Sequence, residues 1–190
     1  IEDLDARGAL LLAGILNSIV YDYCARQKVA GTNFNHWIWH QLPIPEESTL
    51  LELSKWSNET QSISDWLCPR VIELTFTAWD LEPFAREAGY QGPPFRWDEE
   101  RRFHLRCELD AAFFHLYGIA RDDVDYIMET FPIVKRRDIA SQRSYRTKDQ
   151  ILDIYDRMQR AIDNGEPYQT LLDPPPADPR VAHPPRERKN

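Results

Sequence analysis

Apolar residues recur at intervals of three and four along most of the chain, and this spacing constrains the fold more than any other feature. The clearest stripe, between residues 147 and 165, consists of Ile151, Ile154, Tyr155, Met158 and Ile162. Residues three and four apart lie on one face of an α-helix, so the stripe predicts a helix that packs on a core. Similar spacing predicts helices over residues 10–28, 69–76, 98–117 and 124–131.

Proline, glycine and capping residues predict where these helices begin and end. Pro69 suits the first turn of a helix, where a missing backbone N–H is tolerated. Thr147 and Gln150 match a capping box at the start of the last helix. Three helices are expected to end at glycines, namely Gly89 after a short helix that begins near Pro83, Gly118 and Gly165.

Residues 34–45 depart from the helical pattern. They contain an aromatic stretch and end in Leu42-Pro43-Ile44-Pro45. Proline restricts itself and the preceding residue to extended geometry, which predicts a short edge strand or an extended arm. The expected fold class is therefore mainly α, a helical domain with a few short strands near the N-terminal end.

The chain is long enough for one domain or two small ones. We expect a first segment over residues 1–60, with a helix, a loop and an extended part, and a helical domain over residues 61–165. Residues 166–190 form a proline-rich tail, and the stretch from residue 173 onward holds six of the fourteen prolines. This composition predicts an extended, frayed end.

Composition excludes several classes of protein. A hydrophobic content of 42% is too high for a wholly disordered chain, and a net charge of −8 excludes a uniformly basic surface. Cys24, Cys68 and Cys107 are scattered and odd in number, which favours reduced thiols in a cytoplasmic protein. The longest apolar run, Gly8 to Leu16, is too short for a membrane span. Because the chain begins at Ile1 without methionine, we expect it to be a piece of a longer protein.

A basic segment stands out against this acidic background. Between Lys135 and Arg160 there are eight basic and four acidic side chains, a local net charge of +4 that leaves −12 for the remaining residues. Such polarity would direct a polyanion to one face. The candidate DNA-binding residues here are Lys135, Arg136, Arg137, Arg143, Arg146 and Lys148. The alternative is a solvated loop with ion pairs on the helix surface.

A second candidate segment follows the first predicted helix. It carries amides, a hydroxyl and cations, the groups that contact base edges and phosphates. The candidate residues are Arg26, Gln27, Lys28, Thr32, Asn33 and Asn35. The alternative is an ordinary helix C-terminus, at which Gly31 supplies a left-handed cap.

Sequence motifs offer little support for catalysis. The chain has no G-x-S-x-G and no G-x-G-x-x-G, so neither a serine nucleophile nor a phosphate-binding loop is expected. Asp173-Pro-Pro-Pro176 is similar to the acidic-Pro-Pro-aromatic motif of amino-methyltransferases but has proline at the aromatic position. We therefore assign no catalytic residue.

Two histidine pairs have spacings that would suit a metal on a helix. His36 and His40 are four residues apart, and His104 and His115 are eleven apart on the same predicted helix. No cluster of further ligands surrounds either pair in the sequence. We therefore favour aromatic packing for the first pair and a buried polar network for the second, and we predict no metal site.

Many short stretches resemble the C-terminal region of large restriction–modification N6-adenine DNA methyltransferases, which join the methylase to its own target-recognition domain. In the first segment these are Leu16-Asn17-Ser18, Tyr21-Asp22-Tyr23, Ala25-Arg26-Gln27-Lys28, Gly31-Thr32 and Gln41-Leu42-Pro43-Ile44-Pro45. In the second they include Glu73-Leu74-Thr75, Ala78-Trp79-Asp80-Leu81, Trp97-Asp98-Glu99-Glu100-Arg101-Arg102, Leu109-Asp110-Ala111-Ala112, Phe131-Pro132-Ile133-Val134-Lys135 and Tyr145-Arg146-Thr147-Lys148. The resemblance covers roughly residues 9–162.

The resemblance implies that residues 1–60 are the end of a target-recognition domain and that the catalytic domain lies upstream. In that family the upstream domain binds S-adenosylmethionine, so the cofactor is expected in the parent enzyme and not in this fragment. The implied partners are double-stranded DNA and the upstream methyltransferase domain, in a restriction–modification or phage-defence system. The alternative is a helical protein–protein interaction module without direct DNA contact, which the acidic net charge favours for residues 64–165.

Overall fold

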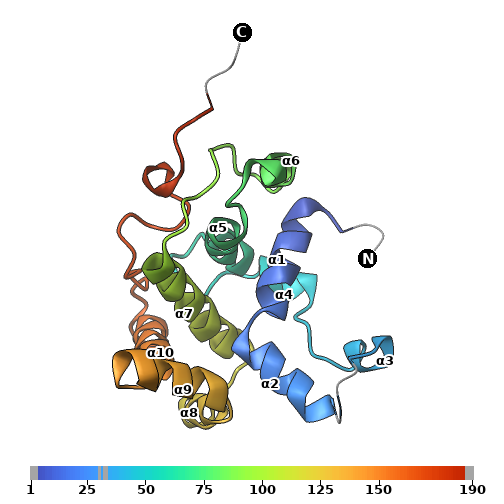
Figure 1. The fold of residues 1–190 in the computed structure, drawn as a ribbon, viewed down its shortest axis with the longest axis vertical. Helices are drawn as coiled ribbons and strands as arrows, with labels where there is room; N and C mark the ends of the chain where they lie inside the picture. The colour runs from blue at the N-terminus through green and yellow to red at the C-terminus, as the bar shows by residue number, and fades with distance from the viewer. Residues whose placement is uncertain (1–3, 30, 32–33, 187–190) are drawn as a thin grey trace.

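The computed structural model describes residues 4–29, 31 and 34–186, and Figure 1 shows that they form a bundle of helices joined by short connections. In chain order the α-helices are α1 (Ala6–Leu16), α2 (Ile19–Lys28), α3 (His36–Trp39), α4 (Glu47–Leu51), α5 (Ile63–Thr75), α6 (Glu82–Glu87), α7 (Glu99–Leu116), α8 (Arg121–Glu129), α9 (Pro132–Gln142) and α10 (Arg146–Asn164). The prediction of a mainly α fold is confirmed. The expected short strands are not, because the β pairing within the described residues amounts to two isolated bridges, Leu53–Ser62 and Phe95–Ala182.

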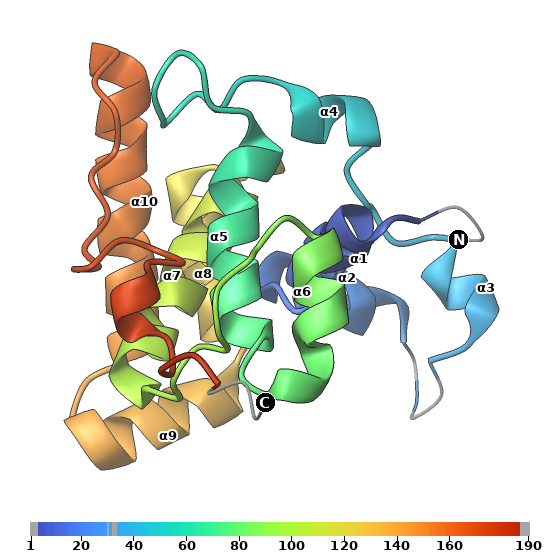
Figure 2. The same ribbon diagram turned by 90° about the horizontal axis from the view of Figure 1, so that it is seen from above.

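Helix α7 occupies the centre of the fold. It packs against α10 and α5, and its C-terminal half is buried almost all round, from Leu109 to Phe114. Figure 2 shows α5, α7 and α10 running beside one another, with α1 and α2 on the far side of α5 from α10. A helix enclosed on several sides needs apolar residues beyond a single stripe, which explains why α7 has a weaker stripe than α10.

The predicted helix over residues 10–28 is two helices, α1 and α2, which meet at a bend of 66°. At the break, the Ser18 hydroxyl accepts a hydrogen bond from the Tyr21 N–H and caps α2. The Asp110 carboxylate on α7 accepts a second one, from the Ile19 N–H at 2.8 Å. These acceptors satisfy the backbone donors that a new helix start leaves free, so the apolar stripe continues while the axis turns.

Pro69 lies inside α5 and not in its first turn, which corrects the prediction. The helix begins earlier because the Ser62 hydroxyl caps it by accepting a hydrogen bond from the Asp65 N–H. Proline at position 69 cannot donate to the Asp65 carbonyl, and the Gln61 side chain donates to that carbonyl instead, at 3.4 Å.

Residues 34–45 contain a short helix where the sequence predicts a strand or an extended arm. The Asn35 side chain caps α3 by accepting a hydrogen bond from the Ile38 N–H at 3.0 Å. The Trp39 ring packs edge-on against Tyr21 and Phe34. A cap and an aromatic anchor therefore form one helical turn before the prolines enforce extended chain.

Several predicted helix ends are confirmed. Asp98 caps α7 through its side chain, and Gly118 follows the helix with φ +65°. Gly89 and Gly165 also take positive φ after α6 and α10. The predicted segment boundary near residue 60 falls between α4 and α5, and buried side chains on both sides of it belong to one apolar cluster.

The proline-rich segment is extended, as predicted, but residues 168–183 are packed against the helices and are not frayed. The buried Glu108 carboxylate of α7 accepts hydrogen bonds from the Tyr168 hydroxyl and the Thr170 hydroxyl. The Arg101 guanidinium donates to the Pro174 carbonyl at 2.6 Å. Polar groups of α7 therefore replace the regular hydrogen bonding that a proline-rich chain cannot make for itself.

Among the described helices, none is by itself both long and apolar enough to cross a membrane, although α1 and α2 pass that test as a bent pair.

Candidate nucleic-acid interface

Most of the predicted basic segment is a helix, α9, and not a loop. Pro132 occupies the first turn, where its missing N–H has no helical partner to lose. The helix ends at Arg143, whose φ of +63° is left-handed. The next helix, α10, begins at Arg146, and the expected capping box is not formed because the Thr147 N–H donates to the Asp138 side chain at 2.6 Å. That hydrogen bond joins α9 to the start of α10.

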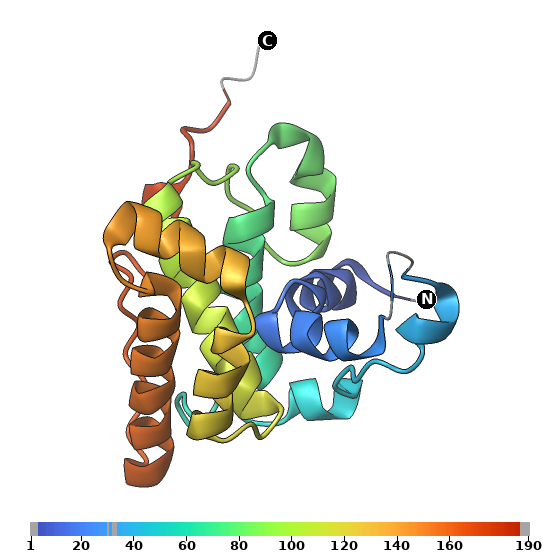
Figure 3. The ribbon, with the colours of Figure 1, turned by 60° about the horizontal axis from the view of Figure 1, so that its bottom comes forward.

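Helix α9 lies on the surface and none of its residues is buried. It packs against α10, and Figure 3 shows it crossing the α7 and α10 pair with one end turned toward α2. Ile133 is 53% exposed and Ile139 is 47% exposed. A helix that buries so little of itself contributes little to the core, so its composition is free to serve a surface function.

The structure divides the six predicted cations of this segment into two groups. Arg136, Arg137 and Arg143 are exposed and form neither an ion pair nor a side-chain hydrogen bond with the described residues. Lys135, Arg146 and Lys148 are only partly exposed, and each is paired with an acidic residue from another part of the chain. The ion pairs of the second group agree with the alternative of a solvated, ion-paired surface, and a DNA-binding role for the first group stays a prediction.

The paired cations hold α8, α9 and the start of α10 together. Glu129 accepts from Lys135 at 2.6 Å and from Lys148 at 2.7 Å, and these two hydrogen bonds lower its pKa to about 2. Lys148 also pairs with Asp125 at 2.8 Å, and Arg146 pairs with Glu100 of α7. Because this network neutralises the three cations, they have little charge left for a polyanion.

The second candidate segment, at the end of α2, is divided in a similar way. Arg26 is paired with Asp22 at 2.8 Å, whereas Gln27 and Lys28 are exposed. The Asn35 oxygen is already used as the cap of α3. The predicted residues Thr32 and Asn33 lie outside the described residues.

Gly31 does not form the left-handed cap that the sequence predicts. Helix α2 ends at Val29, which is its C-cap and whose backbone is extended with φ −89°. The Val29 N–H still donates to the Ala25 carbonyl, so the last turn closes without a glycine.

The two candidate segments meet at Phe131, the residue that precedes α9. The Arg26 guanidinium lies over the Phe131 ring, 4.7 Å from its centroid. Phe131 is buried, and the neighbouring Tyr145 hydroxyl donates to the Met128 carbonyl at 2.7 Å. One cation–π contact therefore joins the C-terminal part of α2 to the residue before α9, with exposed cations on α9 and exposed polar residues at the end of α2.

Exposed guanidinium groups on a surface helix suit phosphate binding, since each can donate two parallel hydrogen bonds to a phosphate. Ile133 and Ile139 add exposed apolar contacts beside them and were not predicted. Pro132 was the available signal for α9, because proline after a helix can also begin the next one.

Of the two histidine pairs considered in the sequence, His104 and His115 each contact different residues of the protein. His104 lies 3.3 Å from Glu100, and the His115 ring stacks on Tyr155 with centroids 3.9 Å apart. Burial lowers the pKa of His115. Within the described part of the chain no group of three or more histidine, cysteine or acidic residues is arranged to hold a metal ion.

Comparison with known proteins finds no matching family model, no matching curated protein and no matching solved structure.

Proposed function

We propose that this chain is a DNA-recognition and accessory region of a site-specific adenine DNA methyltransferase, in which α9 contacts the phosphate backbone of double-stranded DNA. The observation that carries the proposal is the set of three exposed arginines, Arg136, Arg137 and Arg143, which have no partner in the described residues. In a chain of net charge −8, three guanidinium groups without a partner in the described residues, two on α9 and one at its C-cap, favour an anionic ligand.

The end of α2 would act beside this phosphate contact. Gln27 carries an amide that can address a base edge, and Lys28 carries a cation for a flanking phosphate. Thr32 and Asn33 are proposed for the same role on the basis of their side-chain chemistry. The packing of Arg26 on Phe131 supports this part of the proposal, because side chains that contact nucleobases must be held in position by the protein around them.

The identity of the parent enzyme rests on the sequence resemblance. It implies an upstream domain that binds S-adenosylmethionine and a role in restriction–modification or phage defence in the cytoplasm. Our assignment of no catalytic residue to the present chain agrees with this division of labour. The partners proposed for the chain are therefore double-stranded DNA and that upstream domain.

Photocrosslinking tests the proposed contact directly. A photoreactive residue would replace Ala140, which is exposed on α9, and in a matched control it would replace Glu87, which is exposed on α6. With a labelled duplex at low salt, we expect a crosslink from position 140 that the Arg136→Ala, Arg137→Ala and Arg143→Ala substitutions together abolish. Equal crosslinking from both positions, or crosslinking at position 140 that survives the three substitutions, would reject the proposal.

A second candidate function is protein–protein interaction, and an apolar groove favours it. The groove lies between α1 and α4, has a volume of about 330 Å³ and is lined by Leu4, Leu12, Ile44 and Leu51 among others. Leu51 is 63% exposed there. If the groove receives a partner, Leu51→Asp should abolish the assembly while leaving the duplex crosslink intact, as judged by sedimentation of the whole enzyme.

A further inference from the structure

Two imidazole rings face each other at α3, one from His36 in the helix and one from its C-cap residue His40, in a part of the molecule that the proposed function does not use. The Nε2 atoms of His36 and His40 are 3.1 Å apart, and the ring centroids are 4.3 Å apart. Both side chains are exposed. The spacing of four residues places them on one face of the helical turn, where side chains can contact each other.

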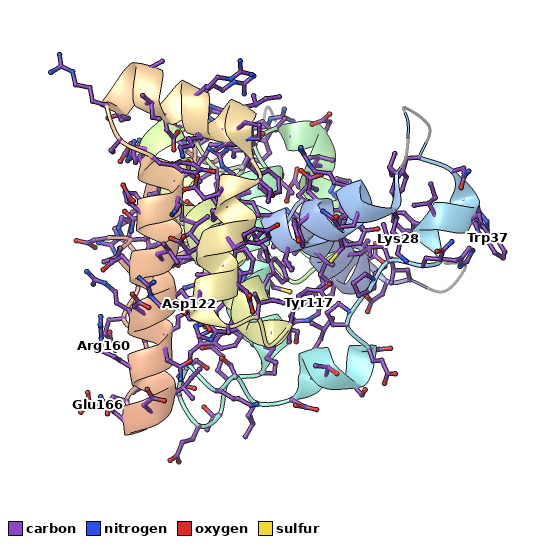
Figure 4. The ribbon with its side chains drawn as sticks, turned by 90° about the horizontal axis from the view of Figure 1, so that it is seen from below. Lys28, Trp37, Tyr117, Asp122, Arg160 and Glu166 are labelled. Carbon is purple, nitrogen blue, oxygen red and sulfur yellow. The ribbon has the colours of Figure 1, made fainter. Side chains whose placement is uncertain are left out.

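The helix that carries this pair is held at both ends and from one side. The Asn35 side chain caps its N-terminus, and the Gln41 amide donates to the Trp37 carbonyl at 3.3 Å. Trp39 packs edge-on against Tyr21 of α2. The opposite face is open, and Figure 4 shows Trp37 at the outer edge of α3, pointing away from the body of the protein.

The separation of the two nitrogen atoms matches the bite of a metal chelate. An ion about 2.0–2.1 Å from each imidazole nitrogen, with an angle of about 90–109° between the bonds, places the nitrogen atoms roughly 2.9–3.4 Å apart. The observed 3.1 Å lies within that range. Without an ion, one ring can donate a hydrogen bond to the other. A shift of its proton to Nδ1 and a small ring rotation would free both Nε2 lone pairs.

The close approach of the two rings changes the interpretation made from the sequence, which assigned this pair to aromatic packing and predicted no metal site. We propose that His36 and His40 form a two-point binding site for a divalent transition-metal ion of the kind that prefers imidazole, such as Cu²⁺, Ni²⁺ or Zn²⁺. Because the pair is exposed, the remaining coordination positions face solvent and are filled by water or by a ligand from another molecule. Metal binding at this site does not involve the arginines of α9. An experiment that rejects the proposed DNA contact would therefore leave the metal site untouched, and the reverse also holds.

Calorimetric titration of the whole chain with each metal chloride tests the proposal. We expect one ion per chain, with Cu²⁺ bound more tightly than Ni²⁺ or Zn²⁺, as the general stability order for nitrogen ligands requires. His36→Ala and His40→Ala should each weaken binding by roughly 100-fold, because either change converts a chelate into a single contact. His183→Ala is the matched control, since His183 is also exposed but lies in the C-terminal segment.

A register variant separates a chelate from two independent histidines. The double substitution His40→Ala with Gln41→His keeps the number of histidines but moves one of them off the shared helix face. We expect this variant to bind as weakly as His40→Ala. The proposal is overturned if the register variant binds like the wild type, or if His183→Ala weakens binding as much as His36→Ala does.

Discussion

The ion pair between Arg70 and Glu108 lies at the centre of the molecule, where α5 meets α7. The two side chains are 6% and 0% exposed and 2.8 Å apart, and the Arg70 guanidinium also lies 3.4 Å from the centroid of the Trp66 ring. Removing Arg70 leaves the buried Glu108 charge without an opposite charge, and loss of one member of a buried pair typically costs about 3–5 kcal/mol. The positions of α5 and α7 therefore depend on a polar contact as well as on apolar packing.

We predict that Arg70→Met lowers the free energy of unfolding by about 3–5 kcal/mol. The double variant with Glu108→Gln should recover part of that loss, because the buried charge is then removed. Urea denaturation monitored by circular dichroism measures both. Arg26→Ala, which breaks an exposed pair with Asp22, is the control and should cost less than about 1 kcal/mol. A loss for Arg70→Met no larger than for this control would contradict the account.

Asp110 makes stability depend on pH in the direction opposite to an ordinary carboxylate. It lines a cavity of about 340 Å³ beside the α1–α2 bend, and burial raises its pKa from 3.8 to about 7, although the Ile19 N–H opposes the shift. Between these two values the folded chain holds a proton that the unfolded chain has lost. Stability should therefore fall as the pH rises from about 4 to about 7.

The Asp110→Asn variant tests this dependence, because asparagine keeps the acceptor for Ile19 and cannot ionise. At 1.36 kcal/mol per pKa unit, the wild-type group contributes at most about 4 kcal/mol of pH dependence. Urea denaturation at pH 5 and pH 8 should show a larger decrease for the wild type than for the variant. Parallel pH profiles for the two proteins would show that Asp110 is ionised throughout.

At the scale of elements, α9 differs from the helices that build the core. It has no buried residue, whereas α7 buries most of its C-terminal half. Helices with few buried contacts open locally at a lower free energy than core helices do. We predict that hydrogen exchange of the α9 amides is faster than that of α7 by several orders of magnitude, and that a bound DNA duplex slows exchange in α9. Protection of α9 equal to that of α7 in the free protein would be inconsistent with this prediction.

The sequence predicts a helix well where one face of that helix is buried, and poorly where the helix has no buried face. The stripe from Ile151 to Ile162 predicts α10 to within a residue at its start, because packing and pattern have the same period. Helix α9 has no such stripe, so its charged residues suggest a loop. The bend at Ser18 is also hidden, because Asp110, one of the two groups that stabilise it, comes from 91 residues away.

The sequence predicts which basic residues the candidate site contains, but not which of them form ion pairs. The basic residues of the segment from Lys135 to Lys148 are visible in the sequence as a local excess of charge. Which of them are free depends on Glu129, Asp125 and Glu100, which approach from α8 and α7. Spacing along the chain carries no information about these partners, and the division into paired and free cations appears only in three dimensions.

At the scale of the whole molecule, the C-terminal segment acts as part of the fold. Leu172 and Ala182 are buried, and Glu73 accepts hydrogen bonds from Arg101 and from the Ala177 N–H. We predict that truncation after Glu166 lowers Tm by several degrees, at about 2–4 °C for each kcal/mol lost in a chain of this size. Calorimetry measures the change, with Arg180→Ala as a control that breaks an exposed pair. A truncated chain that melts at the wild-type temperature would show that the segment is dispensable.

The molecule is acidic overall but carries a basic helix on its surface. The central claim is that α9 binds DNA through the charge of Arg136, Arg137 and Arg143. The most direct test is the salt dependence of duplex binding, measured by fluorescence anisotropy for the wild type, the triple alanine variant and a control. The control replaces Lys55, Arg86 and Arg180, which are exposed outside the basic segment, and so changes net charge equally. Each phosphate contact contributes about −0.9 to the slope of log K against log salt, so the triple variant should lose about 2.7 from its magnitude. We expect the control to keep the wild-type slope, and an unchanged slope in the triple variant would contradict the claim.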